Sequence, residues 1–99
     1  MKLFLDDSRP FPPSGFQCCR DAKTAMTLLS VLKFEFISLD YSLEDELTGL
    51  DVLKFMKERG IYVPRINIHS NNIEGIGLMR RYCEENFPKS KISVNTLDK

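Results

Sequence analysis

The sequence of 99 residues lacks several features that mark common classes of protein. It contains no run of about eighteen consecutive apolar residues, so it predicts no membrane-spanning helix. The opening residues, Met1 to Leu5, are followed at once by two aspartates, which does not fit a signal peptide. We therefore expect a cytoplasmic protein that does not bind a membrane.

The sequence also lacks net charge, since 14 lysines and arginines balance 14 aspartates and glutamates. No overall field would draw the protein to a nucleic-acid duplex or an anionic membrane, so any phosphate binding must be local. Zinc-site spacing is missing as well. Cys18, Cys19 and Cys83 are odd in number and two of them are adjacent, which predicts reduced thiols that are mostly buried.

Internal repeats, low-complexity segments and interdomain linkers are likewise missing. The length is enough for one hydrophobic core but not for a second substrate or regulatory domain. We expect a single domain over residues 1–99, with its function on one small surface, in a monomer or a weak dimer.

Short apolar runs alternate with amphipathic stretches, a pattern typical of α/β sheets. Strands are predicted at residues 3–5, 16–19, 34–39 and 65–68, with a short edge strand at 91–94. Helices are predicted at about 22–32, with Asp21 as N-cap, from Thr48 and Gly49 to a stop at Gly60, and at about 75–86. These elements predict a small, open, mostly parallel sheet of four to five strands, with helices on both faces.

The first connection of this sheet is unusual. Only Ser8 to Gly15, with three prolines, separates the first two strands, whereas a parallel crossover normally needs a dozen or more residues and a helix. Either a proline-rich loop replaces the first crossover helix, or the second strand runs differently from the rest. A loop would leave the carboxyl edge over the first strand open, which would suit a ligand larger than one phosphoryl group.

Carboxylates follow two of the predicted strands. Asp6 and Asp7 end the first strand and Asp40 ends the third, and open α/β sheets bind ligands at this edge. Crowded carboxylates raise each other's pKa and cost stability unless a cation compensates them. Mg²⁺ would do so with all three as ligands, because it binds carboxylates, water and substrate phosphate. The simpler alternative is that these aspartates cap helices or bind loop amides.

Arginines are the other countercharges for these carboxylates. Arg9 and Arg20 carry planar guanidinium groups that match a phosphate bidentately, so both are candidates for holding the substrate. The alternative for either one is a surface ion pair that contributes under about 1 kcal/mol.

The only histidine of the chain, His69, follows the fourth predicted strand and is placed for proton transfer near neutral pH. Ser70 and Asn72 could donate hydrogen bonds to a phosphoryl oxygen, or cap the third helix. Gly75 could permit close approach of a ligand, or be an ordinary loop glycine. We predict as catalytic residues His69, Asp40, Asp7 and Ser70, and as substrate-binding residues Arg9, Arg20, Asn72 and Gly75.

Taken together, these motifs resemble the cyclic-phosphate processing receiver domain family, whose fold is that of CheY-like receiver domains. The residues that carry the resemblance are Leu3-Phe4-Leu5-Asp6-Asp7 with Arg9 and Pro10, then Arg20, Ser38-Leu39-Asp40, Thr48-Gly49 with Asp51, and His69-Ser70-x-Asn72-x-x-Gly75 with Met79. The resemblance covers nearly the whole chain. It implies a receiver-like fold and the processing of a cyclic phosphate or related nucleotide ester by phosphodiester hydrolysis.

The sequence departs from related patterns at several positions. Catalytically complete members carry a histidine and an aspartate directly after the residue that matches Asp40, where this chain has Tyr41 and Ser42. Ordinary receivers carry a Lys-Pro pair after the last strand, which is missing here. Three interpretations therefore stay open: a cyclic phosphodiesterase, a binding or interaction module without turnover, and a receiver that is phosphorylated on Asp40.

Overall fold

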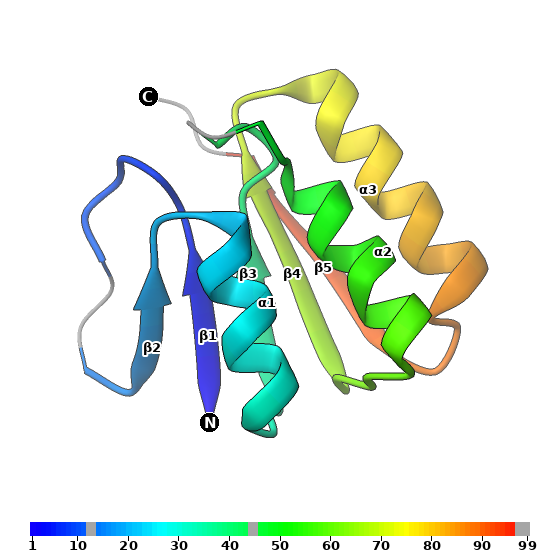
Figure 1. Ribbon diagram of the computed structural model, residues 1–99. Helices are drawn as coiled ribbons and strands as arrows, with labels where there is room; N and C mark the ends of the chain where they lie inside the picture. Colours follow the sequence, from blue (N-terminus) through cyan, green and yellow to red (C-terminus); the bar gives the residue numbers. More distant parts are fainter. Residues whose placement is uncertain (12–13, 44–45, 97–99) are drawn as a thin grey trace.

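The computed structural model describes residues 1–11, 14–43 and 46–96. They form a parallel sheet of five strands in the order β2-β1-β3-β4-β5, with three helices (Figure 1). The strands are β1 (Lys2–Leu5), β2 (Phe16–Cys19), β3 (Phe36–Leu39), β4 (Arg65–Ser70) and β5 (Lys91–Thr96). The helices are α1 (Ala22–Val31), α2 (Gly49–Arg59) and α3 (Ile73–Asn86). The predicted receiver-like sheet is confirmed.

The first connection is a loop. β1 and β2 pair in parallel with Leu5 opposite Cys19, and no helix lies between them in the part of the chain that the structure describes. Arg20 fastens this loop to the sheet, because its Nη1 donates to the backbone oxygens of Asp6 at 3.2 Å and Arg9 at 2.7 Å. The guanidinium of Arg20 also lies 3.8 Å from the ring centroid of Phe11. The loop therefore replaces a crossover helix, which was the first of the two alternatives.

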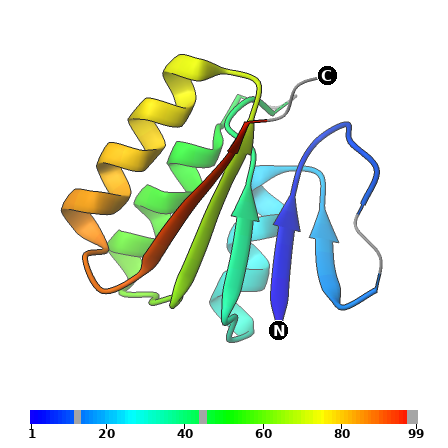
Figure 2. The same ribbon diagram turned by 180° about the vertical axis from the view of Figure 1, so that it is seen from behind.

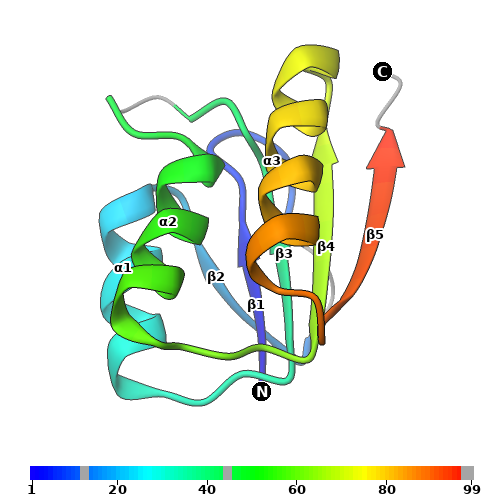
Figure 3. The ribbon, with the colours of Figure 1, turned by 90° about the vertical axis from the view of Figure 1, so that its right-hand side faces the viewer.

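All three helices lie on one face of the sheet, as the views from behind and from the side show (Figures 2 and 3). This differs from the expected arrangement with helices on both faces. Right-handed crossovers from β2 to β3, β3 to β4 and β4 to β5 all move the same way across the sheet, so they place their helices on the same side. Only the connection from β1 to β2 moves the other way, and its described residues, 6–11 and 14–15, form no helix.

The hydrophobic core lies between the sheet and this helix layer. Alternate strand residues face the helices and are fully buried, as in Leu3 and Leu5 of β1. They pack into one cluster with helix residues such as Leu53, Met56 and Met79. Truncating one of these side chains to alanine would cost about 2–5 kcal/mol of stability.

The ends of several helices and strands agree with the sequence predictions, and β4 is longer than predicted. Asp21 caps α1 as predicted, accepting a hydrogen bond of 2.9 Å from the Thr24 amide. Gly60 ends α2 in the left-handed conformation, with φ of 68°. β4 continues two residues beyond its predicted end, so that His69 and Ser70 belong to the strand and point to opposite faces of the sheet. Among the described helices, none has the length and apolar character to cross a membrane.

Candidate functional site

The carboxyl edge of the sheet gathers Asp6, Asp40 and His69 from three neighbouring strands. One oxygen or nitrogen atom of each lies within 4.8 Å of the corresponding atoms of the other two, and all three residues are buried. The strands are adjacent in the order β1-β3-β4, which is why residues far apart in the sequence meet here. This is the edge at which parallel sheets bind their ligands.

Asp6 is fully buried and is held by its own loop. Its Oδ1 accepts hydrogen bonds from the backbone amides of Ser8 and Arg9, both at 2.9 Å. Its Oδ2 lies 3.0 Å from His69 Nε2 and 3.4 Å from Arg9 Nε. Burial raises the pKa of Asp6, but the two backbone amides and His69 outweigh it and hold the pKa below its usual value. Asp6 is therefore an anion at neutral pH.

His69 uses both of its ring nitrogens inside the protein. Nε2 faces Asp6, and Nδ1 lies 2.6 Å from the hydroxyl oxygen of Ser38. Burial lowers the pKa of His69, although Asp6 acts in the opposite direction, so the ring is neutral near pH 7. An ionised Asp6 can only accept, which assigns the proton to Nε2 and leaves Nδ1 to accept from Ser38. The ring also stacks on Phe4, with centroids 4.7 Å apart.

The hydrogen bonds continue from His69 across the sheet. Ser38 accepts from Asn67 Nδ2 at 3.0 Å, and Asn67 Oδ1 accepts from the hydroxyl of Ser93 at 2.7 Å. A directed network thus runs from β5 through β4 and β3 to Asp6. Sequence reasoning assigned no role to these three residues, although Ser38 stands in one of the motifs that carry the family resemblance. The available signal was a polar residue between apolar neighbours, as in Asn67 between Ile66 and Ile68 and Ser38 between Ile37 and Leu39.

Asp40 is crowded by other negative charges. Burial, together with the charges of Asp6 and Asp7, raises the pKa of Asp40 to about 6, against a hydrogen bond from Ser70 that lowers it. The backbone of Asp40 is fixed as well, because its amide donates to Leu5 at 3.0 Å. A cation bound beside Asp40 would therefore stabilise its ionised form.

A polar cavity of about 360 Å³ opens beside Asp40. Its lining residues are Asp7, Ser8, Arg9, Asp40, Ser42, Ser70, Asn71 and Asn72. Five of the predicted site residues therefore share one cavity wall, whereas Asp6 and His69 lie behind it. The cavity offers a guanidinium group, hydroxyls and amides around a carboxylate.

Comparisons with known proteins identify the family and the fold of this chain. The family model of the cyclic-phosphate processing receiver domain matches residues 1–85. The chain belongs to this family. Its fold is similar to that of the receiver domain of the Francisella response regulator 1452, with a TM-score of 0.65 and 20% identity over 96% of this chain and 81% of that chain. No curated protein matches the chain significantly.

Two predicted substrate-binding residues of this cyclic-phosphate processing receiver domain lie outside the cavity lining. Arg20 is occupied with the backbone of the loop, as described above. Gly75 packs against Tyr41, whose ring atoms a Cβ at this position would overlap. Asn72 lines the cavity and also caps α3, accepting from the Gly75 amide at 2.9 Å. The capping interpretation of Asn72 is therefore confirmed, while its ligand role stays a prediction.

The site of this receiver domain fits a magnesium ion in its donor chemistry. Asp6 and Asp40 supply carboxylate oxygens to this cluster, which hard divalent cations prefer, whereas Asp7, the third predicted ligand, is not in the cluster and lines the adjoining cavity. Burial, and then the neighbouring charges of Asp6 and Asp7, raise the pKa of Asp40, so a bound cation would favour its ionised form. His69 is less suited as a ligand, because its Nε2 donates to Asp6 and its Nδ1 accepts from Ser38.

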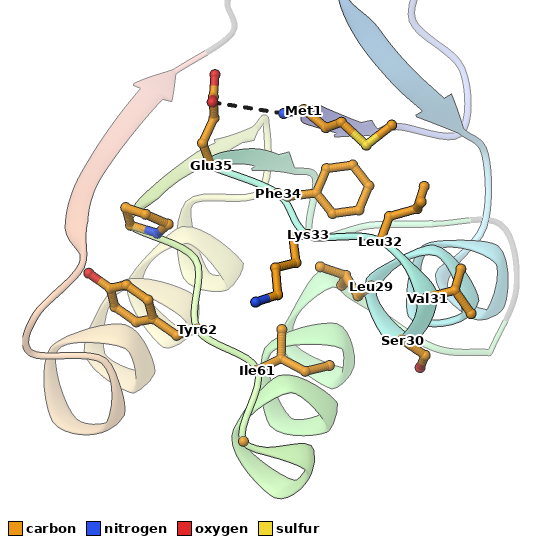
Figure 4. Close-up of a pocket in the computed structure, with 12 residues that line it drawn as sticks. Met1, Leu29, Ser30, Val31, Leu32, Lys33, Phe34, Glu35, Ile61 and Tyr62 are labelled. Atoms are coloured by element: carbon orange, nitrogen blue, oxygen red, sulfur yellow. Dashed lines mark ion pairs between the residues drawn. The ribbon is translucent and has the colours of Figure 1, made fainter.

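A larger cavity, of about 760 Å³, lies at the opposite edge of the sheet (Figure 4). It lies where Met1, Phe34 and Pro64 precede their strands, and Lys33 points into it. Its only ion pair joins the Met1 amine to Glu35 at 3.8 Å, among the residues that the structure describes. Because this edge carries neither the carboxylates nor His69, the smaller cavity is the candidate site.

Proposed function

We propose that this receiver-like domain binds a cyclic phosphate ester in the cavity beside Asp40 and hydrolyses one of its phosphodiester bonds. The observation that carries the proposal is the shared cavity wall, where the guanidinium of Arg9 and the carboxyl of Asp40 lie next to the buried Asp6. The family name supports the choice of a cyclic phosphate as ligand.

Arg9 is the group that would hold the phosphate. Its Nε is buried 3.4 Å from Asp6 Oδ2 and makes no hydrogen bond within the described residues. Arg9 lines the cavity, and a guanidinium group can donate two parallel N–H bonds to a phosphate. Arg20 is already bound to backbone oxygens, so the two arginines have different roles in this proposal.

The reaction would proceed by attack of water on phosphorus. A bond forms between the water oxygen and phosphorus, one ester bond breaks, and the released ribose oxygen takes a proton to leave a phosphomonoester. Asp40 lines the cavity and would orient the attacking water, while Asp6 is fixed in place by His69 and by two backbone amides. A bound Mg²⁺, held by Asp6, Asp7 and Asp40, would neutralise phosphate charge and lower the pKa of a coordinated water.

A binding module without turnover is the second candidate, and one observation favours it. Tyr41 follows Asp40 directly, and its ring packs against Gly75 at the start of α3. Ser42, the next residue, lines the cavity. Neither side chain supplies the imidazole or carboxylate that the family pattern has at these two positions, which leaves fewer groups for proton transfer.

The test is product formation from 2′,3′- and 3′,5′-cyclic nucleotides, with Mg²⁺ or with a chelator. We expect a phosphomonoester product that Asp40→Asn abolishes and for which Arg9→Gln raises KM. Arg81→Gln, an exposed arginine of α3, is the matched control and should leave turnover unchanged. Saturable binding by calorimetry without product would favour the binding module. Absence of both binding and product would contradict both candidates.

A further inference from the structure

The face of the sheet opposite the helices is not covered by any described helix (Figure 2). A solvent-facing sheet normally alternates apolar residues toward the core with polar residues toward water. Here three neighbouring strands instead place phenylalanines on the uncovered face, which we call the open face: Phe4 of β1, Phe16 of β2 and Phe36 of β3. Phe11 of the first loop joins them.

The four rings form one connected platform. Edge-to-face contacts join Phe4 to Phe11 at 6.3 Å, Phe4 to Phe16 at 6.2 Å and Phe16 to Phe36 at 6.1 Å between centroids. Three of the side chains are half-buried, and Phe11 is 41% exposed. An aromatic patch of this kind on a monomer commonly marks a binding surface.

Cations surround the platform. Lys2 Nζ lies 5.5 Å from the centroid of Phe16, and the guanidinium of Arg65 lies 4.8 Å from that of Phe36. Lys91 of β5 is the parallel partner of Arg65, so it lies on the same face. Among the described strand residues on this face, none is acidic. The open face is therefore locally basic although the chain has no net charge.

This combination fits single-stranded nucleic acid. Bases stack on aromatic side chains, while lysines and arginines follow the phosphates. Ser93 and Asn95, both exposed on β5, add hydrogen-bonding groups for base edges. A second copy of the chain is a poorer fit, because face-to-face pairing would bring the two sets of cations together without acidic partners.

The open face leads to the proposed site through one loop. Phe11 contacts the platform at Phe4, and Arg9, two residues earlier, lines the cavity beside Asp40. A single-stranded nucleic acid lying across the open face would thus have its end near the phosphate-binding cavity. A 2′,3′-cyclic phosphate requires the 2′-hydroxyl of ribose, so only an RNA can carry this group at its 3′ end. This chemistry favours RNA over DNA as the ligand.

We propose that the open face binds single-stranded RNA and presents its 3′ end, closed as a 2′,3′-cyclic phosphate, to the cavity. The choice of RNA and of this end group rests on the proposed function, whereas the binding of a single strand rests on the platform and its cations. The two parts can therefore fail separately.

Strand binding is tested by fluorescence anisotropy with the full chain and a labelled oligouridylate of about ten nucleotides that ends in a 3′-hydroxyl. We expect saturable binding that weakens with salt, with competition by unlabelled RNA but little by duplex RNA. Phe11→Ala removes an exposed ring and should weaken binding about fivefold or more. Arg65→Glu should weaken binding by a similar factor or more, because it reverses a charge that faces the phosphates.

The control variant is Lys57→Glu, on the exposed side of α2 in the helix layer, and it should leave the affinity within about twofold. Circular dichroism confirms that each variant is folded. The proposal is overturned if the native chain does not bind, if Phe11→Ala and Arg65→Glu bind like the native chain, or if Lys57→Glu weakens binding equally. It is also overturned if the chain forms a dimer that Phe11→Ala dissociates and that does not bind RNA.

The end group is tested with the same oligonucleotide ending in a 2′,3′-cyclic phosphate. We expect tighter binding than for the 3′-hydroxyl end, and Arg9→Gln should remove the difference while the open face still binds. If the RNA binds equally well with either 3′ end group, the open face still binds RNA, but the proposed presentation of the end group is contradicted. Turnover of small cyclic nucleotides without strand binding would keep the proposed function and overturn this inference.

Discussion

Nε2 of His69 donates a hydrogen bond of 3.0 Å to Oδ2 of the fully buried Asp6. This contact joins the residue that follows β1 to the end of β4, and it fixes the orientation of a carboxylate that would otherwise be set only by its own loop. His69 is not among the residues that line the cavity. His69 is thus placed as a positioning residue for Asp6, and its predicted role in proton transfer stays a prediction.

His69→Ala should destabilise the protein by about 3 kcal/mol, because it removes a buried ring together with its hydrogen bonds to Asp6 Oδ2 and to the Ser38 hydroxyl. A double-mutant cycle with Asp6→Asn, measured by urea unfolding, should give a coupling energy of about 1–3 kcal/mol. Ser93→Ala, at the exposed end of the same network, should cost about 1 kcal/mol. A coupling energy near zero would contradict the contact between His69 and Asp6.

The stability of the metal-free protein should depend on pH through Asp40. Its pKa is about 6 when folded, against a usual value of 3.8, so the folded state binds the proton more tightly. The free energy of unfolding should therefore fall as pH rises from about 4 to about 6, by about 3 kcal/mol in total.

His69 works in the opposite sense, because its lowered pKa makes stability rise with pH just below 6.5. The difference between Asp40→Asn and the native chain isolates the Asp40 effect. We expect Asp40→Asn to be relatively more stable at pH 7 than at pH 4, as measured by unfolding in a chelator. If the difference in unfolding free energy between Asp40→Asn and the native chain does not change with pH, ionisation of Asp40 does not destabilise the folded state.

Magnesium should stabilise the native chain most above pH 6, where Asp40 has lost its proton in the folded protein. A concentration ten times the dissociation constant would raise the free energy of unfolding by about 1.4 kcal/mol. Asp40→Asn should remove most of this gain, whereas Glu84→Gln, an exposed acid on α3, should keep it. Thermal unfolding with and without Mg²⁺ measures the gain in stability for the native chain and the two variants. An equal gain in all of them would show that the ion does not bind at Asp40.

Two glycines of α3 offer a matched pair. A Cβ at Gly75 would overlap the ring of Tyr41, whereas a Cβ at Gly77 has nothing within 4 Å. Gly75→Ala should therefore destabilise the protein by more than about 1 kcal/mol, while Gly77→Ala should stabilise it by about 0.5–1 kcal/mol. Chemical denaturation distinguishes them, and equal effects would show that Tyr41 does not pack tightly on α3.

Local signals in the sequence were sufficient for most of the elements. The spacing of apolar residues and the caps Asp21 and Gly60 predicted the helices closely. α3 begins at Ile73, two residues earlier than predicted, because Asn72 is its cap. The single helix layer followed from the order of the strands, which a sequence read along the chain does not contain.

The site was harder to predict than the fold. Strand-end aspartates correctly pointed to the carboxyl edge, but periodicity could not show that β4 extends through Ser70. That extension turns His69 to the open face, where Ser38 and Asn67 meet it through the register of β3 and β4. Such partners depend on strand pairing between residues about thirty positions apart, so no local pattern reveals them.

The most direct test of the proposed function is phosphorus NMR of a 2′,3′-cyclic mononucleotide incubated with the native chain and Mg²⁺. We expect the resonance of the cyclic ester to be replaced by that of a phosphomonoester, at a rate that falls to background for Asp40→Asn while Arg81→Gln keeps the native rate. An unchanged cyclic ester, or equal rates for the native chain and Asp40→Asn, would contradict hydrolysis at this site.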